Sequence, residues 1–493
     1  MMNSVRPNKA CLSFILLLFG SQVYPQTARD YFSTFQNQAR QEYNNFRLRA
    51  NLEYIDFLRE AWVEYQKMPA LHAPKLDPHV PPIVLPEEEL IKPLRNERIP
   101  FEEIFKPDSN PTTQPEPIVQ IPESPNLEER GFEFVFMGTK EIVRIGNDHR
   151  IYLADCDENS VANAWVAMCH ERYNNVIRDC LIIRQKRSLC DWAYYKMLVY
   201  LGEAFYGKNT NESVLLTAFI YSQSGYSMRL ANTGGRLEML FASRHLIYSL
   251  PFFEIDSVRF YSTIANDAES YIMPLGFSCE KPMSLLLNHS PQFTLLETPL
   301  RILQSERYPD IQVSTTTNKN LIDFFSTYPD SQIEDNLMTR WAIYAETPLS
   351  QAMKQNLYPQ MKNMLQGYSQ LEAANRLLNW VQTAFVYNYD DKVWGNDRVF
   401  FAEETLFYPY CDCEDRSILF SRLVRDILGL NVVLVYYPGH LATAVAFSEF
   451  VQGDFLMVDG VRYTIADPTY INAPVGLSMP DVNNQTAKVI LLR

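Results

Sequence analysis

The chain has 493 residues, of which 47% are apolar and 21% are charged, and its formal net charge is −14. This composition is typical of a chain that buries a sizeable core, so it excludes a wholly disordered or fibrous protein. At roughly 150 residues per domain, the length predicts about three structural units. Because phosphate binding needs a basic face, the negative charge argues against nucleic acid as a partner.

Residues 1–28 have the pattern of a secretory signal peptide. Arg6 and Lys9 precede an apolar run at 12–19, and the hydrophobicity then falls towards Ala28. The run is too short for the roughly 20 residues of a membrane-spanning helix, and no later stretch of that kind occurs. We therefore expect an exported protein without a transmembrane span, either periplasmic, extracellular or at the cell surface.

The cysteines do not suggest a disulfide scaffold or a metal centre. Removal of Cys11 with the signal would leave an odd number, which requires at least one free thiol or an intermolecular bridge. The remaining cysteines are too sparse to staple a chain of this length. They form no CxxC pair and do not cluster with histidines at zinc spacing, so we expect no metal and no cofactor.

Residues 29–68 are predicted to form one long amphipathic helix. An aromatic–aromatic–alanine pattern starts at Phe32, again at Tyr43 and again at Tyr54, with no Pro or Gly inside. Eleven residues over three turns keep such a stripe on one face of a nearly straight helix. The stripe could pack on the protein's own body, or residues 29–67 could mediate self-association or the docking of a partner.

The next segment, 69–130, is predicted to be a Pro-rich linker. It holds 14 prolines between positions 69 and 125, few aromatic residues and an excess of Glu. Such a composition cannot bury enough surface to fold alone and favours extended polyproline segments. We expect either a flexible tether or a strap that lies along the body of the protein.

A reactive cysteine is predicted at the start of a buried helix. Apolar residues recur at helical spacing from Ile418 to Leu428, and Gly429 stands where a helix commonly ends, which places Cys413 in the first turn. The partial positive charge of a helix N-terminus favours a thiolate, and its free N–H groups can hold an oxyanion.

Four predicted strands follow this helix and present two further polar side chains. The strands cover 431–437, 440–447, 455–458 and 462–466. His440 opens the second strand after the turn Pro438-Gly439, and Asp467 ends the fourth. A thiol nucleophile, a general base and a carboxylate that orients the base need this arrangement.

These motifs resemble those of the transglutaminase-like superfamily, the rearranged relatives of papain, in the form found in exported bacterial proteins. The resemblance rests on CED (413–415), GHLATAV (439–445), ADPTY (466–470) and the approach LNWVQTAFVYNYD (378–390). It implies Cys413 as nucleophile, His440 as base and Asp467 as its orienter, in a papain-like core of helices packed on an antiparallel sheet. Gln382 and Tyr410 are candidates for completing the oxyanion hole, and Cys411 is expected to be structural.

A degenerate copy of this domain is predicted upstream. Residues 208–231 align without gaps on 412–435, and 244–254 align on 439–449, which places His245 on His440 and Asn209 on Cys413. The predicted α+β organisation is therefore a degenerate domain at 131–300, a connecting segment at 301–364 and a catalytic domain at 365–493. A chance match between two core helices followed by strands remains the alternative.

The function predicted from these features is cysteine-dependent acyl transfer on a protein or peptide substrate. Peptide or amide hydrolysis through a thioester is favoured, because the exported relatives implied by the resemblance are more often proteases. The main alternative is a catalytically silent binding or assembly protein with the same fold, which the long helix and the Pro-rich segment favour. A protein cross-linking transamidase is a lesser alternative.

Overall fold

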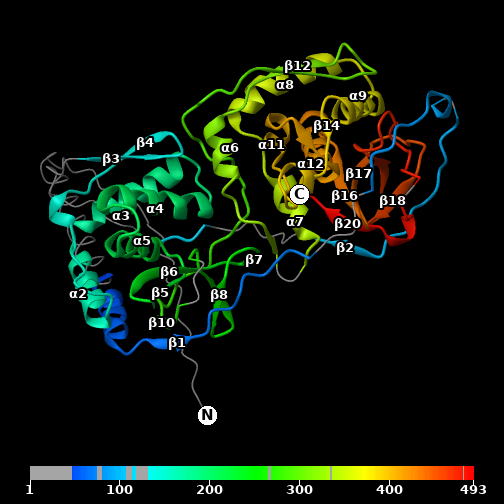
Figure 1. The fold of residues 1–493 in the computed structure, drawn as a ribbon. Helices are drawn as coiled ribbons and strands as arrows, with labels where there is room; N and C mark the ends of the chain where they lie inside the picture. Colours follow the sequence, from blue (N-terminus) through cyan, green and yellow to red (C-terminus); the bar gives the residue numbers. More distant parts are fainter. Residues whose placement is uncertain are drawn as a thin grey trace, which may run out of the picture.

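The structure, a computed structural model, describes residues 47–74, 80–90, 92–106, 114–117, 131–264, 268–333, 336–480 and 482–492. Within them, two α+β units lie side by side, the first drawn in blue to green and the second in yellow to red (Figure 1). The predicted signal peptide at 1–28 lies outside the described residues. An α+β fold with antiparallel sheets is thus confirmed.

The N-terminal unit packs helices against a six-stranded sheet. Its helices are 47–59, α2 (Glu158–Met168), α3 (Tyr173–Lys186), α4 (Asp191–Tyr206) and α5 (Asn211–Gln223). Its sheet has the order β1-β10-β5-β6-β9-β8, formed by Val63–Tyr65, Ser270–Ile272, Met228–Thr233, Arg236–Ala242, Val258–Tyr261 and Phe252–Ile255. A hairpin of β3 (Phe132–Phe136) and β4 (Thr139–Val143) contacts α3 and α4.

The C-terminal unit repeats this plan with a buried central helix. The helices are α7 (Thr339–Glu346), α8 (Gln351–Leu365), α9 (Gln370–Thr383), α10 (Asp390–Val393), α11 (Ala402–Phe407) and α12 (Cys413–Leu423), the last continuing as a π-helix, Val424–Leu428. The sheet order is β18-β19-β17-β16-β20-β2, formed by Phe455–Val458, Val461–Ala466, His440–Ala446, Asn431–Tyr437, Lys488–Leu491 and Glu103–Phe105.

The two sheets have the same strand order when one is listed in reverse, although β1 runs antiparallel to β10 and β2 runs parallel to β20. In each unit a long helix leads into a hairpin, β5–β6 or β16–β17, that forms the middle of the sheet. Beside the second hairpin strand, the sheet continues with β9 and β8 in the N-terminal unit and with β19 and β18 in the C-terminal unit. Beside the first hairpin strand, it continues with β10 or β20. An N-terminal strand, β1 or β2, completes each edge. This shared order supports the predicted internal repeat.

The segment between the two sheets is less separate than the sequence suggests. It contains β11 (Arg301–Gln304), β12 (Gln312–Thr315), α6 (Lys319–Phe325) and β13 (Ser331–Ile333), which pairs with β7 (His245–Ile247) of the N-terminal unit. Its helix α7 packs on α12, and Trp341 of α7 stacks on Tyr436 of β16 with ring centroids 5.2 Å apart. The predicted boundary at 365 therefore divides helices that share one core, because the apolar face of α7 is buried there.

The predicted helix at 29–68 is described only from residue 47, and it is shorter than predicted. It ends at residue 59, and Val63–Tyr65 forms β1, paired antiparallel with β10. Tyr54 lies in the core against Trp165 and Phe277, with ring centroids 4.9 and 4.5 Å away. The described part of the stripe thus packs on the protein's own body, and helical periodicity could not show that a sheet edge was available beyond it.

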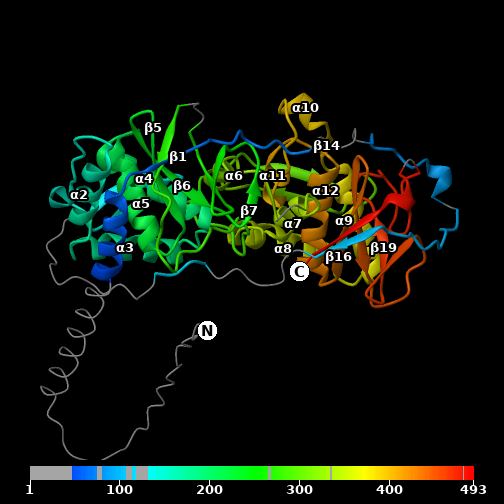
Figure 2. The same ribbon diagram turned by 90° about the horizontal axis from the view of Figure 1, so that it is seen from below.

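Residues 80–106 of the Pro-rich segment lie on the C-terminal unit, whereas Leu71, Gln114 and Pro115 contact the N-terminal unit. We call residues 80–106 the strap. Seen from below, the blue chain runs from β1 along one face of the molecule to the C-terminal unit (Figure 2). The strap pairs with both edges of that sheet, since Ile99 donates to the Phe455 carbonyl of β18 and β2 pairs parallel with β20. These pairings hold residues 80–106 against the sheet, so the described residues favour the strap over the tether.

Candidate active site

Cys413 lies where the sequence predicts, at the first position of α12. The preceding residue, Asp412, is the N-cap, and its carboxylate accepts the backbone N–H groups of Glu414 and Asp415. Asp415 in turn accepts the Asp412 N–H, which completes a capping box. These reciprocal bonds fix the start of the helix and hence the position of the Cys413 sulfur.

His440 is positioned by the hairpin between β16 and β17. The two-residue turn Pro438-Gly439 reverses the chain, with Gly439 at a φ of 75°, so that His440 pairs directly with Tyr437. The imidazole lies nearly parallel to the Tyr437 ring, at an interplanar angle of 17°. The strand register and the ring contact together hold the imidazole in one orientation.

Asp467 contacts His440 as predicted. Its Oδ2 lies 2.8 Å from His440 Nε2, and its Oδ1 accepts the backbone N–H groups of Thr469 and Tyr470. A carboxyl group held by these contacts orients the imidazole so that its other nitrogen, Nδ1, faces away from Asp467. That Nδ1 has no hydrogen-bond partner among the described residues.

Cys413 and His440 line the same cavity. Its other walls are formed by Trp341, Glu414, Tyr436, Gly439 and Leu441. The cavity measures about 10 Å³, which is at most the space of one water molecule. The exposed fractions are 1% for Cys413 and 2% each for His440 and Asp467, so in this conformation the three residues are sealed from solvent.

The predicted thiolate is wrong for this closed conformation. Burial raises the pKa of Cys413 well above its ordinary value, and the neighbouring Asp412 and Glu414 carboxyl groups raise this pKa further. The Leu441 N–H donates to the sulfur and lowers the pKa, but this contribution is smaller. The thiol is therefore the favoured form in this conformation, because desolvation outweighs the contribution of the helix N-terminus.

Several buried carboxyl groups surround the start of α12. Burial, with contributions from Asp397, raises the pKa of Asp390 to about 7 and that of Glu414 to about 8. The buried Arg340 lies among them, 2.6 Å from Asp397 and 2.9 Å from Asp330. One guanidinium cannot neutralise every acid, so part of this cluster is protonated near neutral pH.

The cluster has ligand atoms close enough for a metal, but its chemistry fits helix capping better. Asp412, Cys413 and Glu414 each offer one atom within 4.8 Å of the others. They are consecutive residues, and the Asp412 carboxylate already accepts two backbone N–H groups at the helix start. We therefore assign no metal role to these three residues.

Gln382 has a different role from the one predicted. Its Nε2 donates to the backbone carbonyls of Asp467, Tyr470 and Ala473, and its side chain is fully buried. Because all its donors are used on the turn after β19, Gln382 holds Asp467 in place rather than facing an oxyanion. Gln382 lies near the end of α9, and nothing in the sequence marks it for this role.

Neither Tyr410 nor Cys411 lies in the cavity. Tyr410 is 39% exposed on the short strand β15 (Tyr410–Cys411), which pairs with β14 (Val386–Tyr387). Cys411, on the same strand, is buried, and burial raises its pKa. Within the described residues every cysteine is a free thiol.

The N-terminal unit has the same framework but different side chains at these positions. The first residue of α5 is Asn211, so the predicted match of Asn209 to Cys413 is wrong by two residues; Asn211 accepts the Leu237 N–H through Oδ1 at 3.0 Å. In the C-terminal unit the corresponding Leu441 N–H donates to Cys413. The strand register places Arg236 opposite Thr233, as His440 lies opposite Tyr437. The N-terminal unit therefore lacks both thiol and imidazole at this place.

The predicted match of His245 to His440 is thus wrong. His245 lies in β7, after the hairpin, and pairs with Ile333 of β13. Burial lowers its pKa to about 3, so it is a neutral core residue. The sequence alignment needed a long gap before His245, whereas the hairpin register shows that the equivalent residue stands immediately after the Gly234-Gly235 turn.

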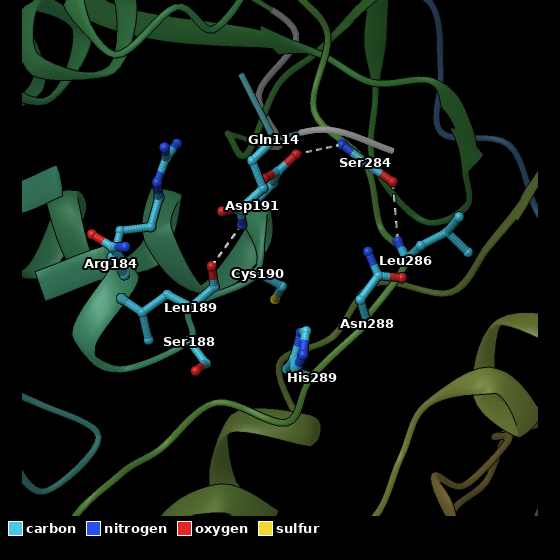
Figure 3. A pocket seen from close by; sticks show the side chains of 11 residues that line it. Gln114, Arg184, Ser188, Leu189, Cys190, Asp191, Ser284, Leu286, Asn288 and His289 are labelled. Carbon is cyan, nitrogen blue, oxygen red and sulfur yellow. Dashed lines mark hydrogen bonds between the residues drawn. The ribbon is translucent and has the colours of Figure 1, made fainter. Parts of the chain in front are cut away.

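A separate cavity of about 330 Å³ lies in the N-terminal unit, beside the start of α4 (Figure 3). Cys190 and His289 both line it. Burial raises the pKa of Cys190 to about 12, and its sulfur accepts the Ala193 N–H of its own helix. The Asp191 side chain accepts hydrogen bonds from the Tyr226 hydroxyl and the Ser284 backbone N–H. The described residues that line this cavity therefore include no nucleophile paired with a general base.

Comparisons of the chain with protein-family models, curated proteins and solved structures find no match. The site is consequently interpreted from its own geometry. Among the described residues, no helix combines the length and apolarity required to cross a membrane.

Proposed function

We propose that the protein is an exported cysteine-dependent acyl-transfer enzyme, a peptide or amide hydrolase of the transglutaminase-like, papain-related type. The observation that carries the proposal is the buried pair of His440 and Asp467, 2.8 Å apart, in which His440 Nδ1 has no hydrogen-bond partner among the described residues and His440 lines the same cavity as Cys413. A nucleophile, a base and an orienting carboxylate from three separate elements are the requirements of thiol catalysis.

The residues would act as follows. His440 takes the proton of the Cys413 thiol as the sulfur attacks the amide carbonyl, and the new C–S bond gives a tetrahedral oxyanion. The C–N bond then breaks, and His440 gives the proton to the leaving amine. Water adds to the thioester, which releases the carboxylic acid and restores the thiol. Asp467 keeps the imidazole in the required tautomer and stabilises its charged form.

Turnover requires the cavity to open, because a space of one water cannot hold a peptide group. Opening would also admit water to the sulfur and reduce the desolvation that keeps its pKa high. The conformation described here is accordingly the closed, resting form of the proposed enzyme.

The closed cavity also favours a second candidate function, a silent binding or assembly protein. Cys413 is fully buried and its pKa is raised, as for a structural cysteine. In that case the buried His440–Asp467 pair would serve stability only. The two functions differ in whether any amide bond is cleaved in a Cys413-dependent way.

The test is hydrolysis of labelled casein and of a pool of internally quenched peptides by the full chain. Cys413→Ala should abolish turnover and leave the melting temperature within a few degrees, since the change removes one sulfur atom. Cys411→Ala makes the same change two residues away and should keep activity. Cleavage that survives in purified Cys413→Ala protein would refute the proposal, and absence of cleavage by every form would favour the silent protein.

A further inference from the structure

The strap crosses the C-terminal unit at the two turns that present the proposed base and its carboxylate. The Val80 N–H donates to the Gly439 carbonyl at 2.8 Å, and Gly439 immediately precedes His440. Five residues later, the Leu85 N–H donates to the Ile471 carbonyl at 2.8 Å, and Ile471 follows Asp467 by four positions.

The contact with Ile471 is that of an added strand. The Ile471 N–H donates to the Ile83 carbonyl at 2.8 Å, and Val84 forms a parallel bridge with Ile471. Both backbone groups of Ile471 are thus used by the strap. Main-chain pairing of this kind gives affinity for any extended peptide, whatever its sequence.

Side-chain specificity comes from a small apolar pocket. Leu85 is only 4% exposed and packs with Tyr470, Ala473 and Met479. Its neighbour Val84 is 58% exposed, so alternate side chains point into the pocket and into solvent, as in a strand. An apolar side chain at the Leu85 position is therefore the feature that this edge selects.

The strap is also joined to the wall of the closed cavity. Gly439 lines the cavity with Cys413 and His440, and its carbonyl is held by Val80. Pro81, Pro82 and Pro86 have no N–H groups and keep this stretch extended without internal hydrogen bonds. The segment therefore depends on few contacts for its place, and another extended chain could make the same ones.

We infer that residues 80–85 occupy a peptide-binding edge of the C-terminal unit, and that this edge takes an extended polypeptide segment with an apolar residue at the position of Leu85. The inference rests on the proposed function, since it names the substrate class of the same site. Departure of residues 80–85 frees the backbone groups of Gly439 and Ile471 together with the apolar pocket, and it loosens the cavity wall beside Cys413.

Alkylation of Cys413 by iodoacetamide, followed by peptide mass spectrometry, tests the inference without requiring catalysis. Leu85→Asp puts a carboxylate into the apolar pocket and should speed Cys413 alkylation about tenfold or more, because labelling follows the population of the open form. Val84→Asp is the matched control: it adds the same charge one residue away, in solvent, and should leave the rate within about twofold.

The other cysteines distinguish opening of the strap from unfolding. Cys279 is exposed and gives the reference rate, whereas Cys156, Cys180 and Cys190 are buried elsewhere. Release of residues 80–85 should speed the alkylation of Cys413 but of no other buried thiol in the two units. Unfolding would speed the alkylation of all of them. A synthetic peptide of residues 78–90 added to Leu85→Asp should restore slow labelling.

A second variant covers the case in which Leu85→Asp does not fold. Val80→Pro removes the N–H that holds Gly439 and keeps the extended backbone, and Val80→Ala keeps that N–H. Faster Cys413 labelling in Val80→Pro than in Val80→Ala is expected. Equal rates of Cys413 alkylation within both pairs, Leu85→Asp with Val84→Asp and Val80→Pro with Val80→Ala, would overturn the inference. Fast labelling without any amide cleavage would instead refute the proposed function and leave the peptide-binding edge standing.

Discussion

Asp467 Oδ2 lies 2.8 Å from His440 Nε2, and in the proposed mechanism this contact sets the tautomer of the imidazole. Asp467→Asn keeps an oxygen for the Thr469 and Tyr470 N–H groups but presents an amide to the imidazole. We predict that it lowers kcat/KM on the order of 10³–10⁴-fold. Asp459→Asn, an exposed carboxylate on the same sheet, should leave kcat/KM unchanged.

The measurement is peptide hydrolysis at several pH values, with the melting temperature recorded for both variants. If Asp467→Asn retains more than half of the wild-type activity, Asp467 does not orient a catalytic imidazole. Loss of activity only in step with unfolding would likewise assign Asp467 to stability.

At this scale the sequence predicts which residues meet but not their protonation. The helix start, the hairpin turn and the end of β19 are each marked by local residues, and the contact of His440 with Asp467 follows from them. The state of Cys413 does not follow, because its pKa depends on burial from every side. The first turn carries three charged residues in sequence, Glu414-Asp415-Arg416, and all three side chains are buried.

Helix α9 and the turn after β19 are joined by Gln382, whose amide donates to three backbone carbonyls. Gln382→Glu would place a carboxylate against these carbonyls, so the turn that carries Asp467 should shift. We predict a loss of about 1–3 kcal/mol in the free energy of unfolding and a lower kcat. Urea unfolding and peptide hydrolysis measure the two effects.

The matched control lies on the same helix. Gln370 is exposed at the start of α9, where its side-chain oxygen accepts from Ser448 and an acid favours the helix N-terminus. Gln370→Glu should therefore keep both stability and kcat. Equal behaviour of the two variants would show that Gln382 does not hold the Asp467 turn.

At the level of elements, local periodicity predicts α12 and its four strands but not where pairing begins or ends. The stripe at 29–68 continues past residue 60 as a pattern, yet the open edge of β10 takes Val63–Tyr65 as a strand. Likewise, the repeat is visible in the sequence, but only the hairpin register shows that Arg236, and not His245, stands at the position of His440. Both errors arise from tertiary pairing that one sequence does not show.

The whole molecule should be more stable at mildly acidic pH than at alkaline pH. Burial raises the pKa of Glu403 to about 6, of Asp390 and Glu404 to about 7 and of Glu414 to about 8. Between about pH 4.5 and 8 the folded protein therefore binds protons that the unfolded chain has released. The stability that these carboxyl groups contribute is full below this window and falls as the pH rises through it.

Calorimetry at pH 5.5 and pH 8.5 measures this effect, and the melting temperature should be lower at pH 8.5. Glu414→Gln stays neutral at both values and should reduce the difference. A melting temperature that rises from pH 5.5 to 8.5 would contradict the raised pKa of these carboxyl groups.

The arrangement of the whole chain was the least predictable from sequence. Composition indicates that the Pro-rich segment cannot fold alone, but its course depends on partners far along the chain, such as Phe455 for Ile99 and Ile471 for Leu85. The helices between residues 301 and 364 likewise join the C-terminal core through contacts such as Trp341 with Tyr436. Long-range pairs of this kind leave no local signal.

The most direct test of the central claim is whether His440 activates the Cys413 sulfur. Alkylation rates of Cys413 and Cys411 should be compared in His440→Ala and its parent, both in the wild-type chain and in Leu85→Asp. We predict that loss of His440 slows the alkylation of Cys413 about tenfold or more and leaves the alkylation of Cys411 unchanged. Equal rates for the two thiols, unaffected by His440→Ala, would contradict a working thiol–imidazole pair.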